Sequence, residues 1–294
     1  KTFNGAPHNN RRSILGRASR TPSLFGRHTI FLGNDDGIKC SRFSCSAYLT
    51  TSEKPSRLPL YLSAFGVTNL VSEDLEQIHD GDILYIDKSG LISRLWDTES
   101  RDNVIFVTNT CNCRCIMCPQ PPGPDTEDFL AINKKILTLV PRNGVSRIAF
   151  TGGEPTIRLE ELLQMFRICT RRFPDVPVIL LTNGRRLHDM EVARKIVEAH
   201  SKITYCIPLF SDIDSIHDEI VGVKGAFAET LQALHNLALL RQRIQLRIVM
   251  QKKNYQRLPQ YAEFIYRNLP FVMHIAFMGM ETVGLASQNS KSVW

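Results

Sequence analysis

No stretch of the 294-residue sequence approaches the roughly 18 consecutive apolar residues that a membrane-spanning helix needs. Hydrophobic residues nevertheless make up 43% of the chain, which is ordinary for a protein with a buried core. The apolar segment of a secretory signal is also lacking near the first residue, Lys1. We therefore expect a soluble, cytoplasmic protein with no membrane partner. A chain that begins with lysine is interpreted as a fragment or a processed product.

Acidic residues are absent from residues 1–30, which hold six of the 36 lysine and arginine residues. The net charge of +7 therefore comes mostly from this segment, and the rest of the chain is nearly neutral. A nearly neutral body argues against an electrostatic surface for nucleic acid, so we expect no nucleic-acid partner. The Ser-, Arg- and Asn-rich composition predicts a disordered basic tail over residues 1–27.

Residues 28–100 predict a small, mainly β N-terminal domain. Runs rich in β-branched and aromatic residues occur at 27–33, 81–87 and 91–97, separated by Gly and Asp. The last two runs predict a hairpin that turns at residues 88–90. This domain is interpreted either as a packing platform or as a surface that binds an extended substrate through an exposed sheet edge.

From about residue 103, apolar runs alternate with helical patterns. The predicted strands lie at 104–110, 147–153, 178–184, 203–210, 244–251 and 271–279. The predicted helices lie near 127–140, 159–172, 188–199, 226–242 and 257–268. Such alternation predicts an α/β fold with a parallel sheet and right-handed crossovers over residues 103–285. Residues 286–294 are taken as the start of a C-terminal extension.

The segment "TCNCRCIMCPQ", residues 110–120, places four cysteines within eight positions. Cys111, Cys115 and Cys118 have the spacing C-x3-C-x2-C, and Cys113 falls outside it. Three thiolates on a tight loop can hold three irons of a [4Fe–4S] cluster and leave the fourth open. The alternatives are a redox dithiol and a structural zinc site, although zinc is commonly held by two separate C-x2-C pairs and no second pair is present.

Other polar residues follow the later predicted strands, where parallel sheets carry their chemistry. The sequence "GGEP" at 152–155 offers two glycines, which allow close backbone approach, and the carboxylate of Glu154 for a ligand amine. A Gly-Gly turn followed by a helix start is the alternative interpretation. Thr182 and Asn183 follow the third strand, and Ser211 follows the fourth.

Taken together, "CNCRCIMC", "TGGEP", "LLTNG" and "SIHDEIVGVKGAFAETLQAL" resemble the radical S-adenosylmethionine superfamily over residues 103–285. The resemblance implies a partial (β/α)6 TIM-like barrel, a [4Fe–4S] cluster and S-adenosylmethionine as cofactors. It implies cluster ligation by Cys111, Cys115 and Cys118. Cofactor contacts are implied for Met117, Gly152, Gly153, Glu154, Thr182, Asn183, Ser211 and Arg247.

Two of these positions depart from the family pattern. Met117 stands where an aromatic residue is usual, and methionine can fill that space. The serine that usually ends strand four corresponds to Pro208, while Ser211 lies three residues later. Arg247 is the candidate partner of the cofactor carboxylate.

Within the superfamily, "CIMCPQPP" and "IPLFSDIDSIHDEIVGVKGAFAETL" resemble the His-Xaa-Ser system maturases. That resemblance implies a peptide substrate, an electron donor such as flavodoxin or ferredoxin, and a second maturase as partners. The same chemistry on a small molecule or nucleoside is the alternative, and a non-catalytic metal-binding or RNA-binding module is a third.

The remaining cysteines and histidines have simpler interpretations. Cys169 and Cys206 are predicted to be core residues, and a metal site at Cys40 and Cys45 is not expected. His217 is expected to organise a helix start. His274, which alternates within a predicted strand, is kept as a candidate that faces the barrel interior.

Overall fold

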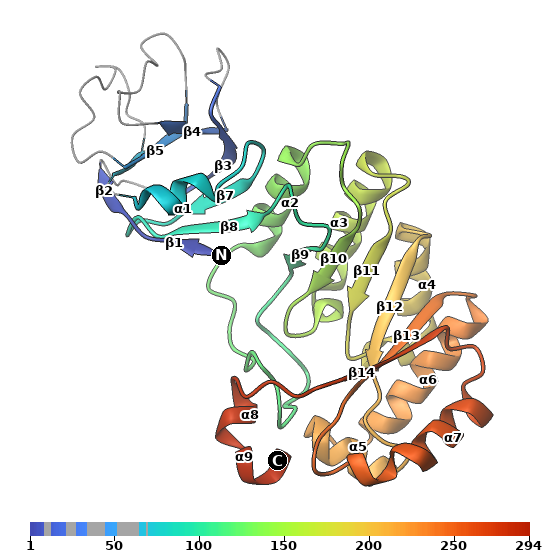
Figure 1. Ribbon diagram of the computed structural model, residues 1–294. Coiled ribbons are helices and arrows are strands. Elements are labelled where there is room, and N and C mark those ends of the chain that lie inside the picture. The colour runs from blue at the N-terminus through green and yellow to red at the C-terminus, as the bar shows by residue number, and fades with distance from the viewer. Residues whose placement is uncertain (9–12, 22–27, 34–44, 52–64, 69) are drawn as a thin grey trace. The chain divides into compact units, whose positions relative to one another are not determined.

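The computed structural model describes residues 1–8, 13–21, 28–33, 45–51, 65–68 and 70–294 (Figure 1). The chain forms two compact units. The first comprises Lys1–Val104 and Lys134–Ser146, and the second comprises Ile105–Asn133 and Arg147–Trp294. Among the described residues, no helix combines the length and the apolar character that crossing a membrane requires.

The first unit is built on an eight-stranded sheet with the strand order β1-β8-β7-β3-β4-β5-β6-β2. Its strands are β1 (Thr2–Phe3), β2 (Ala6–His8), β3 (Ile14–Ser19), β4 (Thr29–Gly33), β5 (Ala47–Thr50), β6 (Phe65–Thr68), β7 (Ile83–Ile86) and β8 (Ile92–Trp96), and a short helix, α1 (Ser72–Glu76), precedes β7. The predicted hairpin is confirmed, because β7 and β8 pair antiparallel.

One N-terminal segment, residues 2–8, supplies both terminal strands of this sheet. β1 pairs with β8, and β2 pairs with β6. Between them lies Gly5, where an added Cβ would stand 2.5 Å from a side-chain carbon of Val67. The close approach that glycine permits therefore lets one continuous segment occupy both ends of the sheet.

The predicted disordered tail over residues 1–27 does not agree with this sheet. Its described residues form β1, β2 and β3, and Phe3, Ile14 and Ala18 are buried in the core of the first unit. The prediction was wrong there because it rested on charge and composition. A few apolar side chains at strand spacing are enough to anchor short strands in a sheet that other residues complete.

The second unit contains a six-stranded sheet with the order β14-β13-β12-β11-β10-β9. The strands are β9 (Asn103–Phe106), β10 (Ile148–Thr151), β11 (Val178–Leu181), β12 (Ile203–Pro208), β13 (Arg243–Val249) and β14 (His274–Met278). The strands from β10 to β14 pair in parallel. The predicted α/β fold with a partial, open barrel is therefore confirmed.

Helices follow the strands as predicted, with additions. The long ones are α2 (Phe129–Leu139), α3 (Leu159–Arg172), α4 (Met190–Ala199), α6 (Ala226–Leu239) and α7 (Leu258–Asn268). In the second unit, three short helices lie outside the predicted helix ranges: α5 (Asp214–Val221), α8 (Leu285–Gln288) and α9 (Ser290–Val293). Of these, α5 contains His217, which was expected to organise a helix start. Single 3-10 turns, η1 (Pro155–Arg158), η2 (Arg185–His188) and η3 (Tyr255–Arg257), precede α3, α4 and α7.

Candidate functional site

The cysteine loop, residues 108–118, follows β9 at the carboxyl end of the sheet. The four thiols on the loop are free. Cys113 is buried, with 2% of its surface exposed, whereas Cys111, Cys115 and Cys118 are half-buried. The burial pattern thus separates Cys113 from the three cysteines that were predicted to be cluster ligands.

The first half of the loop, residues 108–113, packs directly on the backbone that follows β10. The amide of Gly153 donates to the Thr108 carbonyl at 2.7 Å, and the amide of Glu154 donates to the Thr110 carbonyl at 2.8 Å. A Cβ on Gly153 would stand 2.3 Å from the Thr110 carbonyl oxygen, and one on Gly152 would stand 2.6 Å from that of Thr108. The two glycines therefore bring two strand ends together, and a ligand contact for them stays a prediction.

The Glu154 carboxylate is fully buried and has protein donors around it. One oxygen accepts from the Thr156 amide at 2.9 Å, the Thr156 hydroxyl at 2.5 Å and the Thr182 hydroxyl at 2.7 Å. The other oxygen accepts from the Asn183 amide at 2.6 Å. Glu154 and Thr182 thus join the ends of β10 and β11, and their predicted contacts to a cofactor stay predictions.

Two side chains from the end of β11 reach the first half of the loop. Asn183 Nδ2 donates to Asn112 Oδ1 at 2.7 Å and lies 3.3 Å from Cys113 Sγ. Arg185 Nη1 donates to the Asn112 carbonyl at 2.7 Å and lies 3.7 Å from the same sulfur. Asn183 therefore lies against the loop that carries the predicted ligands, while Arg185 was not singled out from the sequence.

The second half of the loop, residues 114–118, is held by the end of α5. The amides of Arg114 and Ile116 donate to the carbonyls of Val221 and Ile220 at 3.0 and 2.9 Å. Gly222 follows with φ +74, and a Cβ there would stand 2.6 Å from the Arg114 carbonyl oxygen. This glycine both ends the helix and lets the loop approach it.

Residues 284–289 also hold the second half of the loop. The Leu285 amide donates to the Cys118 carbonyl at 2.8 Å, and Asn289 Nδ2 donates to the Ile116 carbonyl at 2.8 Å. Gly284 has φ +57, and an added Cβ there would stand 2.5 Å from the Cys118 carbonyl oxygen. Reasoning from the sequence missed these residues, because their contacts to the loop involve main-chain carbonyls that no motif reveals.

A cavity of about 290 Å³ opens beside the second half of the loop. It is lined by Cys115, Met117, Cys118, Pro119, Phe210, Val249, Met278, Gly279, Met280 and Glu281. Most of these side chains are apolar, and they come from the loop and from the ends of β12, β13 and β14. Met117 thus borders a space that fits a small apolar or aromatic group beside two of the predicted cluster ligands.

Ser211 and Arg247 differ in their surroundings. Ser211 is buried, and its hydroxyl contacts Asp212 Oδ1 at 3.3 Å and accepts from the Ile213 amide at 3.1 Å. Arg247 lies on β13 and is half-buried, and among the described residues its guanidinium has no ion-pair partner. Arg247 therefore offers an available cation, whereas Ser211 has local partners; both cofactor assignments stay predictions.

The thiols differ in acidity because their surroundings differ. The hydrogen bond from Cys113 lowers the pKa of Cys111 to about 7, while burial raises the pKa of Cys115 to about 12. Burial also raises the pKa of Cys118. Because thiolates are the metal-binding form, metal binding at this loop must release protons.

The sulfur atoms of the loop thiols are not gathered as ligands of a single zinc ion would be. Among the described residues, no three of the loop thiols have sulfur atoms within 4.8 Å of one another. Four thiolates around one zinc ion at about 2.3 Å must lie closer together than that. Thiolates that each bind a different iron of a [4Fe–4S] cluster stand farther apart, and cluster ligation by Cys111, Cys115 and Cys118 stays a prediction.

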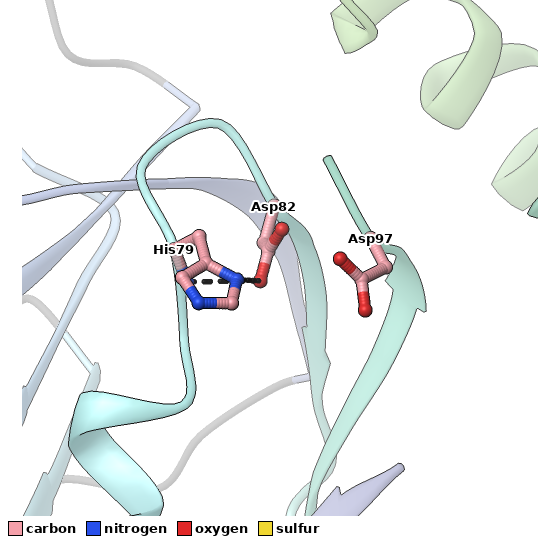
Figure 2. A group of neighbouring side chains, drawn as sticks. All are labelled: His79, Asp82 and Asp97. Atoms are coloured by element: carbon pink, nitrogen blue, oxygen red, sulfur yellow. Dashed lines mark hydrogen bonds and ion pairs between the residues drawn. The ribbon is translucent and has the colours of Figure 1, made fainter. Parts of the chain in front are cut away.

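The only described group with metal-like donor spacing lies in the first unit and consists of His79, Asp82 and Asp97 (Figure 2). Arg94 bridges its two carboxylates, with Nη1 at 3.2 Å from Asp82 Oδ2 and Nη2 at 2.9 Å from Asp97 Oδ2. Thr98 donates its amide and hydroxyl to Asp82 Oδ1, each at 2.9 Å. The guanidinium therefore supplies the positive charge that these carboxylates need, and the group is interpreted as structural.

Comparisons with known proteins match the part of the chain that carries the cysteine loop. The family model described as the radical SAM superfamily matches residues 105–265. The Fe-coproporphyrin III synthase of Methanosarcina barkeri is 31% identical over 158 residues, covering 52% of this chain and 38% of that protein. A GTP 3',8-cyclase of Rhodococcus opacus is 34% identical over 91 residues, covering 29% and 26%. The sporulation killing factor maturation protein SkfB of Bacillus subtilis is 25% identical over 138 residues, covering 45% and 31%.

Among solved structures, Streptococcus suis SuiB bound to S-adenosylmethionine superimposes with a TM-score of 0.50 and 17% identity, over 62% of this chain and 41% of SuiB. At that identity the likeness concerns the fold. The chain spans less than half the length of each of these proteins.

Proposed function

Because the chain belongs to the radical SAM superfamily, whose enzymes use a [4Fe–4S] cluster and S-adenosylmethionine, we propose that it modifies a ribosomally made peptide. In this proposal, Cys111, Cys115 and Cys118 ligate the cluster, and Arg247 binds the cofactor carboxylate. The cofactors supply a 5′-deoxyadenosyl radical that abstracts hydrogen from the substrate. The chain's own residues hold the cysteine loop, orient the cofactor and shape the cavity.

The observation that carries the peptide proposal is the free edge of β14. Among the described residues, β14 pairs only with β13, so its outer backbone groups can pair with an extended chain. Met278 at its end lines the cavity together with Cys115 and Cys118. A peptide added alongside β14 would therefore run toward the predicted cluster ligands.

The first unit supports peptide docking less directly. Both terminal strands of its sheet come from residues 2–8, which pair with β8 and with β6. The described part of this sheet thus offers no long unpaired edge comparable to β14. Docking of a peptide on the first unit stays a prediction.

We further propose that the peptide belongs to a His-Xaa-Ser system, on the likeness of "CIMCPQPP" to its maturases. An electron donor such as flavodoxin or ferredoxin and a second maturase are the proposed partners. Peptide modification is also supported by the likeness to the maturation protein SkfB.

The test is a turnover assay with the anaerobically reconstituted chain and a reductant. A peptide with His-Xaa-Ser repeats and a scrambled peptide of equal composition are compared by mass spectrometry and by 5′-deoxyadenosine release. We expect a mass change in the repeat peptide alone, with slower amide hydrogen exchange over residues 274–278 when it binds. Equal 5′-deoxyadenosine release with both peptides and no mass change would contradict the proposal.

A small-molecule substrate is the second candidate, favoured by the cavity of about 290 Å³ and by likeness to a coproporphyrin synthase and a GTP cyclase. The same assay with GTP and with coproporphyrin in place of the peptide separates the two. Stimulation of 5′-deoxyadenosine release by either compound, with consumption of that compound, would favour this candidate.

A further inference from the structure

A half-buried ion pair, Arg185–Glu229, lies against the first half of the cysteine loop. Arg185 opens η2, and its side chain is 13% exposed. Its Nε donates to Glu229 Oε2 on α6 at 2.5 Å. Its Nη1 donates to the Asn112 carbonyl at 2.7 Å and lies 3.7 Å from Cys113 Sγ. The guanidinium is therefore fixed by a carboxylate on one side and by the loop on the other.

This position places a positive charge near the predicted cluster without making it a ligand. Cys113, the residue that Arg185 touches, stands between the predicted ligands Cys111 and Cys115. Asn183 adds a neutral donor at 3.3 Å from Cys113 Sγ and 3.9 Å from Cys111 Sγ. Net charge, hydrogen bonds to sulfur and solvent exposure are the properties through which a protein sets the reduction potential of an iron–sulfur cluster.

Reduction adds one electron to a cluster that its thiolate ligands already make anionic. A fixed cation nearby stabilises the reduced form more than the oxidised form, and a fixed anion does the reverse. The guanidinium of Arg185 lies against the loop, whereas the Glu229 carboxylate lies on its far side and is 35% exposed. The two charges therefore have opposite effects on the stability of the reduced cluster. The charge on Arg185 is nearer to the loop and is less screened by water.

We propose that the Arg185–Glu229 pair sets the reduction potential of the cluster held by Cys111, Cys115 and Cys118. Arg185 raises the potential, and Glu229 limits that rise. This inference rests on the proposed cluster ligation and does not depend on which substrate is modified. Arg185 is a positioning residue in this account, because it touches the loop and not the substrate.

The chain offers a matched control in the next residue. Arg186 Nη1 donates to the carbonyls of Thr156 and Ile157, away from the cysteine loop. Arg186→Gln removes the same charge from the same turn without removing a contact to the loop. Comparing the midpoint potentials of Arg185→Gln and Arg186→Gln distinguishes the effect of a charge at the loop from a general loss of positive charge.

The experiment is a reductive titration of the reconstituted full chain, followed by electron paramagnetic resonance, with no substrate present. Relative to the wild-type chain, we expect a more negative midpoint potential for Arg185→Gln and a less negative one for Glu229→Gln. Arg186→Gln is expected to match the wild type, and Arg185→Lys, which keeps the charge, is expected to lie between the wild type and Arg185→Gln. Iron content per chain is measured for every variant.

Two results would overturn the proposal. One is that Arg185→Gln binds as much iron as the wild type and has the same midpoint potential. The other is a shift in the same direction for Arg185→Gln and Glu229→Gln, which indicates loop disturbance instead of charge. If Arg185→Gln fails to bind iron, the opposite shifts expected of Glu229→Gln and Arg185→Lys decide the question. A wild-type chain that gives no cluster signal would overturn the ligand assignment itself.

Discussion

The two halves of the cysteine loop are held in different ways. The first half, residues 108–113, has main-chain bonds to Gly153 and Glu154, and it is also reached by the side chains of Asn183 and Arg185. Arg185 is in turn paired with Glu229. The second half, residues 114–118, is held mainly through its main chain, by the end of α5 and by residues 284–289. From this difference we expect the first half to influence the electrostatic environment of a bound cluster and the second half to position Cys115 and Cys118.

The largest expected effect is loss of the cluster, which should follow the removal of a predicted ligand but not the removal of Cys113. Cys115→Ala is expected to abolish cluster binding and activity, because it removes a thiolate that binds iron. Cys113→Ala is expected to preserve most of both, because the Cys113 thiol is buried against Asn183 and Arg185. Iron and sulfide content per reconstituted chain is the measurement. Equal loss from both variants would contradict the assignment of ligands.

The second prediction concerns the close contact between Gly284 and the second half of the loop. Gly284→Ala puts a side chain on a residue with φ +57, with its Cβ 2.5 Å from the Cys118 carbonyl oxygen. We expect a loss of about 3 kcal/mol in the free energy of unfolding, from backbone strain and overpacking together. Lower iron content should accompany this loss, because Cys118 moves.

Gly225→Ala is the matched control for that change. Gly225 has φ +83, but no heavy atom lies within 4 Å of an added Cβ. Its variant therefore carries backbone strain without the clash, and it should bind iron as the wild type does. Equal iron loss in both variants would show that residues 284–289 have no special role at the loop.

The third prediction concerns His217 in α5, the helix whose end holds the second half of the loop. Its Nδ1 accepts the Phe210 amide at 3.2 Å, and burial lowers the pKa of His217 to about 4. Arg185 lowers this pKa further, and Asp218 opposes the shift. Because the pKa is about 6.5 in the unfolded chain, the unfolded state takes up the proton first as the pH falls.

The stability that neutral His217 contributes is therefore fully present above pH 6.5 and is lost as the pH falls through about 4. We expect a loss of about 2 kcal/mol by pH 4.5 that His217→Gln does not show. Urea unfolding of both proteins at pH 7 and pH 4.5 is the measurement. Parallel pH dependences in the two proteins would rule out this role for His217.

The smallest expected effect is on the free energy of unfolding, and it concerns the hydrogen bond from Asn289 in the C-terminal segment. Asn289→Ala removes the hydrogen bond to the Ile116 carbonyl and should cost about 1 kcal/mol of unfolding free energy. Gln288→Ala, at an exposed neighbouring position, should cost much less. Thermal unfolding of the two variants distinguishes them, and equal costs would mean that this hydrogen bond contributes nothing measurable.

Much of the second unit was predictable because its strands are apolar runs and its helices have regular spacing. The six strands were expected close to where they lie, and the cysteine spacing with Gly152 and Gly153 marked the site. Arg185 was not distinguishable from Arg186 in the sequence, because only the fold brings Glu229, 44 residues away, to its guanidinium. Residues 284–289 and the strands within residues 1–27 were missed because short elements depend on partners that are distant in the sequence.

The central claim is that Cys111, Cys115 and Cys118 hold a [4Fe–4S] cluster that binds S-adenosylmethionine. Anaerobic reconstitution with iron and sulfide, followed by electron paramagnetic resonance of the reduced chain with and without S-adenosylmethionine, tests it most directly. The account predicts a [4Fe–4S]⁺ signal that changes when the cofactor is added, together with release of 5′-deoxyadenosine. Bound zinc with no cluster signal and no cofactor cleavage would contradict it and would make the cysteine loop a structural element.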